Sequence, residues 1–278
     1  MTVNPTNRRS VFFISDGTAI TVETLGHSVL CQFPEVQFDI QIMPYVDSEE
    51  RALDVVSLIN QTALKDGVPP LVFDTLVDLD VRAIINTAKA FNLDVFEGII
   101  AKISGELGVA ASPMVGNSHS AVDSEIYKAR IDAVHFALDN DDGARTRHYD
   151  MADIILIGVS RSGKTPTSLY LALQFGLRAA NYPITEDDLD DNRLPKVLRD
   201  YKHKLFGLMI EPDRLVAIRN ERKAGSRYAS FQQCQMELRA IQGIYTSEGI
   251  PCIDVSEMSI EEIATRIIQR TGLQRRIN

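Results

Sequence analysis

Residues 154–172 read IILIGVSRSGKTPTSLYLA, and this stretch decides how we expect the second half of the chain to fold. The part from Gly158 to Thr165 matches G-x-x-x-x-G-K-[ST], the pattern of the phosphate-binding loop, or P-loop. Its two glycines allow a tight backbone arch whose N–H groups point at phosphate oxygens. The apolar run before it predicts a strand, and the residues after it predict a helix whose positive end faces the same phosphates. This context favours a P-loop over the alternative, an ordinary glycine-rich turn.

The whole loop is therefore predicted to bind a nucleotide. Lys164 is expected to reach the terminal phosphate oxygens as a catalytic residue, and the Thr165 hydroxyl is expected to be a ligand of Mg²⁺. The predicted binding residues are Gly158, Val159, Ser160, Arg161, Ser162, Gly163, Lys164 and Thr165.

Short apolar runs alternate with longer amphipathic stretches on both sides of the motif, a pattern typical of βα units and a parallel sheet. After the motif and its strand, we predict strands over 179–182, 205–210 and 252–255. Helices are predicted over 164–175, 212–222, 231–246 and 260–271. This order resembles that of small P-loop kinases, such as the nucleoside-monophosphate and shikimate kinases. We therefore expect a P-loop kinase-like domain over 149–278.

In those kinases, a mobile lid that carries arginines follows at the place of residues 223–228. Catalytic roles are accordingly predicted for Arg222 and Arg227, whose guanidinium groups would stabilise charge on the group in transfer. For Arg219, such a role and a solvated basic helix end are equally good interpretations.

A P-loop enzyme also needs a carboxylate that holds Mg²⁺ through water or orients the nucleophile. The acidic run 186–191 follows the predicted strand 179–182, and Asp188 is our candidate catalytic residue from it; a solvated turn is the alternative. Asp141 and Asp142 follow a helix predicted over 125–138, and we interpret them as the end of that helix.

The first half of the chain shows the same alternation of apolar and amphipathic segments. We predict strands over 11–14, 38–43, 71–73 and 93–95, and helices over 18–32, 48–65, 80–91 and 95–107. The whole chain is thus α/β, with an N-terminal α/β domain over 1–110 and a hinge and connecting helix over 111–148. The loop 15–18 follows the first strand, where it is predicted either to bind an anion or to cap the next helix through Asp16 or Thr18.

The composition limits the classes of protein to which the chain can belong. The 278 residues amount to roughly two domains of ~150 residues. With 29 basic and 38 acidic residues, the net charge of −9 argues against binding nucleic acid or an anionic membrane through bulk charge. No apolar run approaches the ~20 residues that span a bilayer. The three cysteines lie far apart, which fits a reducing cytosol. We expect a cytoplasmic protein without nucleic-acid or membrane partners.

Several further stretches of the sequence, taken together with the P-loop, resemble a known protein family. They are ISDGTAITVETLGHSVL at 14–30, Tyr127-x-x-Arg130-Ile131, Asp141-Asp142-Gly143, ANYP at 180–183 and Arg227-Tyr228-Ala229-Ser230. Over residues 11–272 the chain resembles the bacterial phosphoenolpyruvate synthase regulatory proteins, a family related to the pyruvate, phosphate dikinase regulatory proteins. It is more similar to the synthase branch.

The resemblance implies a bifunctional enzyme. One activity phosphorylates a threonine of phosphoenolpyruvate synthase and inactivates it, with ADP as donor and the family's nucleotide loop at 158–165. The other removes that phosphate with inorganic phosphate and releases pyrophosphate. The alternatives are the same chemistry on pyruvate, phosphate dikinase, a small-molecule P-loop kinase, and a nucleotide-sensing module without catalysis. Whether the two reactions share one site is open, and so is a homo-oligomeric state.

Overall fold

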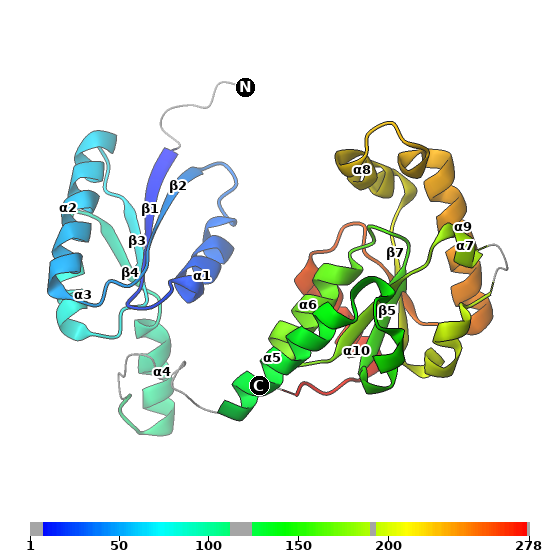
Figure 1. Cartoon of the computed structure of the whole chain (residues 1–278). Helices are drawn as coiled ribbons and strands as arrows, with labels where there is room; N and C mark the ends of the chain where they lie inside the picture. Colours follow the sequence, from blue (N-terminus) through cyan, green and yellow to red (C-terminus); the bar gives the residue numbers. More distant parts are fainter. Residues whose placement is uncertain (1–7, 112–123, 190–192, 277–278) are drawn as a thin grey trace. The chain divides into compact units, whose positions relative to one another are not determined.

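The computed structural model describes residues 8–111, 124–189 and 193–276. The chain divides into two compact units, residues 1–120 and 121–278, and each is described here by itself (Figure 1). Most of the predicted hinge, residues 112–123, lies outside the described residues. No helix among the described residues is long and apolar enough to cross a membrane.

The first unit contains one parallel four-stranded sheet with the strand order β2-β1-β3-β4. Its strands are β1 (Arg8–Ile14), β2 (Gln37–Met43), β3 (Leu71–Asp74) and β4 (Phe91–Asp94). Its helices are α1 (Ile20–Leu30), α2 (Glu49–Asp66), α3 (Leu79–Ile85) and α4 (Glu97–Leu107). Both faces of β1 are buried, because successive residues point to opposite faces: Phe12 packs in one apolar cluster and Phe13 in another.

The bounds of two helices in the first unit differ from the prediction. The helix expected over 80–91 ends at Ile85, because Phe91 begins strand β4 and pairs with Leu71 of β3. The helix expected from residue 95 begins at Glu97, because the Asp94 carboxylate accepts the N–H groups of Phe96 at 2.8 Å and Glu97 at 3.0 Å. Strand pairing and these hydrogen bonds to Asp94 outweigh the helical pattern of the local sequence.

The second unit contains another parallel sheet, with the order β6-β5-β7-β8. Its strands are β5 (Ile154–Gly158), β6 (Ala179–Pro183), β7 (Leu205–Met209) and β8 (Cys252–Asp254). Its α-helices are α5 (Ser124–Asp139), α6 (Lys164–Phe175), α7 (Glu186–Leu189), α8 (Pro212–Arg222), α9 (Phe231–Glu248) and α10 (Ile260–Thr271). The predicted α/β fold class is confirmed, and α6, α8 and α10 have the predicted bounds.

The sheet of the second unit is covered on both faces. Figure 1 shows α6 and α10 on one side of it and α9 on the other. Helix α5 packs on α6 through alanines at positions 133, 137 and 172, so this helix belongs to the second unit.

The two units share the same strand order, with their first strand inside the sheet and the second and third strands on either side of it. In open α/β sheets, ligands bind at the carboxyl ends of the strands where the order reverses. In the second unit that point is the connection between β5 and α6, which holds the P-loop sequence.

Candidate active site

The P-loop forms an arch between a buried strand and a helix. All residues of β5 are buried, which fixes the start of the loop in the core. At Gly158 a Cβ atom would lie 2.6 Å from Ser162 Oγ and 2.9 Å from the Leu208 carbonyl oxygen, so only glycine fits. Gly163 has a left-handed φ of 83° and no side chain caps α6. The first N–H groups of α6 therefore lack a side-chain partner and suit an anion.

Lys164 lies inside this arch. Its Nζ donates to the Val159 carbonyl oxygen at 2.9 Å, and the residue is 4% exposed. Burial lowers the pKa of the ammonium to about 8, although the carboxylates of Asp142 and Asp141 act in the opposite direction. A buried cation beside backbone N–H donors is the arrangement that binds a phosphate group.

Two carboxylates approach the P-loop from the short helix η2 (Asp141–Gly143), which follows α5. The Thr165 hydroxyl donates to Asp141 Oδ1 at 2.7 Å, and Asn181 Nδ2 donates to the same oxygen at 2.6 Å. The Asp142 N–H donates to Asn181 Oδ1 at 3.0 Å. Asn181 is fully buried on β6, the neighbour of β5, so it fixes η2 beside the loop.

These elements enclose a hollow of about 320 Å³. Lys164, Thr165 and Arg222 line it together with Asp142, so it combines cations, a hydroxyl and a carboxylate. The other lining residues are Ser160, Arg161, Gly163, Pro166 and Ile218. Such a hollow can hold a phosphate chain and offers a carboxylate that can accept a proton.

The approach of Asp141 and Asp142 was not predicted from the sequence, where they were interpreted only as a helix end. They lie before the P-loop in the chain, and they are not the last residues of a neighbouring strand. Their proximity depends on Asn181, whose part in the site is visible only once β6 is known to lie beside β5.

The predicted catalytic residues differ in their positions. Arg222 lines the hollow, whereas Arg227 and Asp188 do not. Arg227 is 76% exposed, and its Nη2 lies 2.6 Å from Glu186 Oε1. Asp188 Oδ2 accepts from the N–H and the hydroxyl of Thr185, at 3.0 and 2.9 Å, which is the pattern of a side-chain-stabilised turn. A catalytic role for Arg227 or Asp188 stays a prediction.

Arg219 is fully buried, so its interpretation as a solvated helix end is wrong. Its guanidinium pairs with Glu237 at 2.7 Å and donates to the carbonyl oxygens of Tyr228 at 2.9 Å and Ser160 at 3.2 Å. It also stacks on the Tyr228 ring, 4.1 Å from the centroid. The Tyr228 hydroxyl lies 2.9 Å from Ser160 Oγ. These contacts hold the connection between α8 and α9 against the P-loop.

In the first unit, the loop at 15–18 follows β1 as predicted, but neither Asp16 nor Thr18 caps the next helix. Helix α1 follows Ala19, which has a left-handed φ of 64°, and no side chain caps it. Asp16 Oδ2 instead accepts the N–H of Val77 at 3.0 Å. Helix capping by Asp16 or Thr18 is therefore wrong, and anion binding there stays a prediction.

A buried ion pair lies at the same end of that sheet. Arg82 contacts Asp74 at 3.4 Å and Asp94 at 2.6 Å, at the ends of β3 and β4. Burial raises the pKa of Asp74 to about 6, although its bond from the Leu76 N–H and the charge of Arg82 act in the opposite direction.

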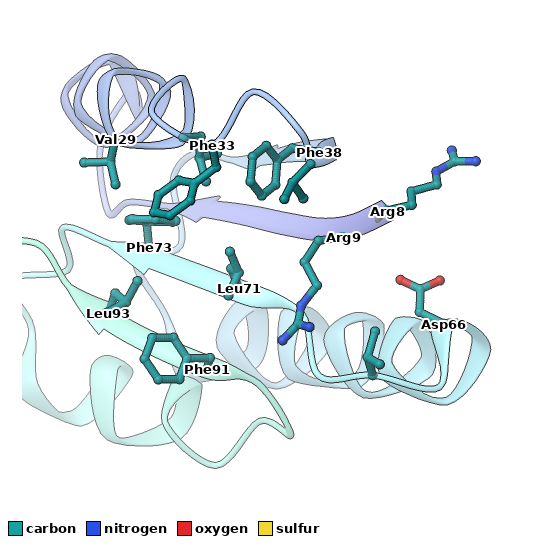
Figure 2. Close-up of a pocket in the computed structure, with 13 residues that line it drawn as sticks. Arg8, Arg9, Val29, Phe33, Phe38, Asp66, Leu71, Phe73, Phe91 and Leu93 are labelled. Carbon is teal, nitrogen blue, oxygen red and sulfur yellow. The ribbon is translucent and has the colours of Figure 1, made fainter. Parts of the chain in front are cut away.

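The first unit also contains an apolar hollow of about 670 Å³ (Figure 2). Figure 2 shows Phe33 and Phe38 on one side of it and Leu71, Phe91 and Leu93 on the other. It includes the first residues of β1, β3 and β4, so it lies at the amino ends of the strands. Its lining is mostly apolar; of its charged residues, Arg8 pairs with Asp39 and Asp66 accepts from Ser10 Oγ at 2.6 Å, while the buried Arg9 Nε has no hydrogen-bond partner among the described residues. The hollow beside Lys164 is therefore the better candidate for an active site.

Known proteins resemble this chain over nearly its whole length. The sequence profile of the family described as kinase/pyrophosphorylase matches residues 11–268. A protein of Acinetobacter baylyi that carries the name of a phosphoenolpyruvate synthase regulatory protein is 72% identical over 270 residues. These residues cover 97% of each chain.

Two further relatives are assigned the same name. A protein of Acinetobacter baumannii is 73% identical over 270 residues, which cover 97% of each chain. One of Psychrobacter cryohalolentis is 67% identical over 274 residues, 99% of this chain and 97% of the relative. A match over nearly the whole length includes both units and the P-loop, and the chain therefore belongs to the kinase/pyrophosphorylase family.

Proposed function

We propose that this chain regulates phosphoenolpyruvate synthase through two opposed reactions. The first transfers the β-phosphoryl group of ADP to a threonine of the synthase, which inactivates it. The second transfers that group to inorganic phosphate and releases pyrophosphate, which restores activity. Support comes from the family, from the names of the relatives, and above all from one observation: Lys164 and Asp142 line a single hollow at the P-loop.

The N–H groups of the arch and the Lys164 ammonium would bind the β-phosphate of ADP. The threonine oxygen of the synthase attacks its phosphorus, the bond from the β-phosphorus to the bridging oxygen breaks, and AMP leaves. Positive charge from Lys164 and Arg222 offsets the charge that develops on the group in transfer. Both side chains line the same hollow.

Asp142 is the carboxylate best suited to accept the threonine proton. Asp141 is occupied, because its Oδ1 accepts from both Thr165 and Asn181. Asp142 lines the hollow, and among the described residues only its backbone N–H, not its carboxylate, has a hydrogen-bond partner. A carboxylate that lines a phosphate site and has no hydrogen-bond partner there has the position of a general base.

The residues present also suit Mg²⁺, which prefers oxygen ligands and shares them with substrate phosphates. Thr165 gives its hydroxyl hydrogen to Asp141, so the lone pairs of its oxygen remain available as a ligand. Within the described residues, no three His, Cys, Asp or Glu side chains form a metal site by themselves, which fits an ion held jointly with the nucleotide. Thr165 and Asp141 would hold it, directly or through water, and the bound ion would neutralise diphosphate charge.

The test uses ADP labelled at either the α- or the β-phosphate. The chain is incubated with each nucleotide and with phosphoenolpyruvate synthase, pyruvate, phosphate dikinase or neither. We expect β-label, but not α-label, on a synthase threonine. Label on the dikinase alone would assign the same chemistry to the other target. Label on a small molecule would assign a metabolite kinase, and nucleotide binding without transfer would assign a sensing module.

A further inference from the structure

A second hollow adjoins the one that contains Lys164. It has a volume of about 360 Å³ and is lined by Ser160, Arg222, Lys223 and Tyr228. Ser160 and Arg222 also line the first hollow, so the two share a wall. The second hollow has no carboxylate among its lining residues, and two of them, Lys223 and Tyr228, do not line the first hollow.

The cations of this hollow are unpaired. Among the residues that the structure describes, neither the Arg222 guanidinium nor the Lys223 ammonium has an ion-pair or hydrogen-bond partner. The neighbouring arginines differ, because Arg219 pairs with Glu237 and Arg227 with Glu186. Two free cations on one small surface repel each other, and an anion between them would remove that cost.

The hydroxyl groups of this hollow are held in place. The Tyr228 hydroxyl lies 2.9 Å from Ser160 Oγ, and the Tyr228 ring lies against the buried Arg219 guanidinium. Arg219 donates to the Tyr228 carbonyl at 2.9 Å and is itself fixed by Glu237 at 2.7 Å. One hydrogen of the two hydroxyls is used in the bond between them, so the hollow presents one further hydroxyl donor together with two cations, a donor set that suits the oxygens of a phosphate dianion.

We propose that the hollow formed by Ser160, Arg222, Lys223 and Tyr228 binds the free phosphate dianion of the dephosphorylation reaction. This inference rests on the proposed function. The phosphoryl group of the phosphothreonine would lie in the first hollow, near Lys164. Arg222 lines both hollows, so its charge offsets the repulsion between the two phosphates.

The reaction balances without a further reactant. An oxygen of HPO₄²⁻ attacks the phosphorus of the phosphothreonine, and the bond from that phosphorus to the threonine oxygen breaks. The proton of HPO₄²⁻ passes to the threonine oxygen. The products are threonine and pyrophosphate.

The first experiment measures binding of inorganic phosphate to the full chain by calorimetry, with ADP present at saturation. The variants are Lys223→Gln, which removes one cation of the hollow, and Lys196→Gln, a control at an exposed lysine elsewhere in the second unit. We expect the wild type and Lys196→Gln to bind phosphate beside ADP, and Lys223→Gln to bind it about tenfold or more weakly. Complete displacement of phosphate by ADP, or equal affinity in all three proteins, would overturn the proposal.

The second experiment compares Michaelis constants. In Lys223→Gln, the ratio of KM for phosphate in dephosphorylation to KM for ADP in phosphorylation should rise about tenfold. A rise in KM for the phosphorylated synthase instead would mean that the hollow holds the phosphothreonine, and would overturn the proposal. If the wild type does not modify the synthase at all, the proposed function fails, whereas the calorimetry still tests the phosphate site.

Discussion

The buried side-chain amide of Asn181 gives the carboxylates of Asp141 and Asp142 different surroundings. Asn181 bonds to the side chain of Asp141 and to the backbone of Asp142, so the first carboxylate is fixed against Thr165 and the second is left free. Two carboxylates one residue apart therefore have different roles. That of Asp141 orients the proposed metal ligand Thr165, and that of Asp142 can accept a proton.

Replacing Asp142 by Asn tests this division. We expect Asp142→Asn to lower kcat for threonine phosphorylation by about 10²-fold or more, since a general base contributes about that much, with a smaller change in KM for ADP. Steady-state kinetics on the labelled synthase measures both constants. Asp150→Asn, an exposed carboxylate elsewhere in the second unit, is the matched control. Equal kcat values for the two variants would contradict the role of Asp142.

The buried ammonium of Lys164 predicts a pH profile. Its pKa is lowered to about 8, so the nucleotide-free enzyme loses this charge as the pH rises past that value. The constant kcat/KM for ADP, which reports the free enzyme, should therefore fall above about pH 8. In Lys164→Arg the guanidinium stays charged, and any remaining activity should lack this fall. A wild-type profile that stays level up to pH 10 would be inconsistent with the buried ammonium.

Asp74 predicts the pH dependence of stability in the first unit. Its pKa is raised from 3.8 to about 6, so between these values the folded state binds more protons than the unfolded state. The free energy of unfolding should fall as pH rises through this window, by roughly 3 kcal/mol in total from this group. Asp74→Asn should remove that fall and stabilise the first unit at neutral pH. Denaturant unfolding of both proteins at pH 4 and pH 7 measures it, and a parallel pH dependence would contradict it.

At the scale of elements, local signals predicted some boundaries well. Helix α10 begins after Ser259, which forms a capping box with Glu262, and α8 has Pro212 in its first turn. Strand β4 was predicted only in part: the expected strand 93–95 overlaps its last residues, whereas its first residue, which lies in a predicted helix, becomes part of the strand through pairing with β3. The P-loop could be predicted from its spacing. The carboxylates beside it could not, because a buried amide on another strand brings them there.

The contact between α8 and α9 predicts a stability effect. Arg219→Ala would leave the Glu237 carboxylate buried without its partner, and we expect the free energy of unfolding of the second unit to fall by about 3–5 kcal/mol. The double variant Arg219→Ala/Glu237→Ala should recover part of that loss. Chemical denaturation of the wild type, both single variants and the double variant gives the coupling. Strictly additive losses would mean that this ion pair does not hold the two helices together.

At the scale of the whole molecule, the net charge of the chain and the charge of the cations around the P-loop have opposite signs. The chain has a net charge of −9, yet the P-loop region gathers Arg161, Lys164, Arg222 and Lys223. Each unit has its own apolar core, and the residues to which phosphate chemistry is assigned here lie in the second unit. Such a charge distribution favours the binding of phosphate at the P-loop over a general affinity for polyanions.

In the proposed reaction, the arch at residues 158–165 binds the diphosphate of ADP, and the β-phosphoryl group passes to the synthase. The most direct test is the rate at which the β-phosphoryl group of labelled ADP appears on a synthase threonine, with wild type and Lys164→Ala measured side by side. We expect the rate to be at least ~10²-fold lower in the variant. Circular dichroism of the variant should show that it retains its fold. Equal rates of labelling by both proteins would contradict the role of the arch in binding ADP.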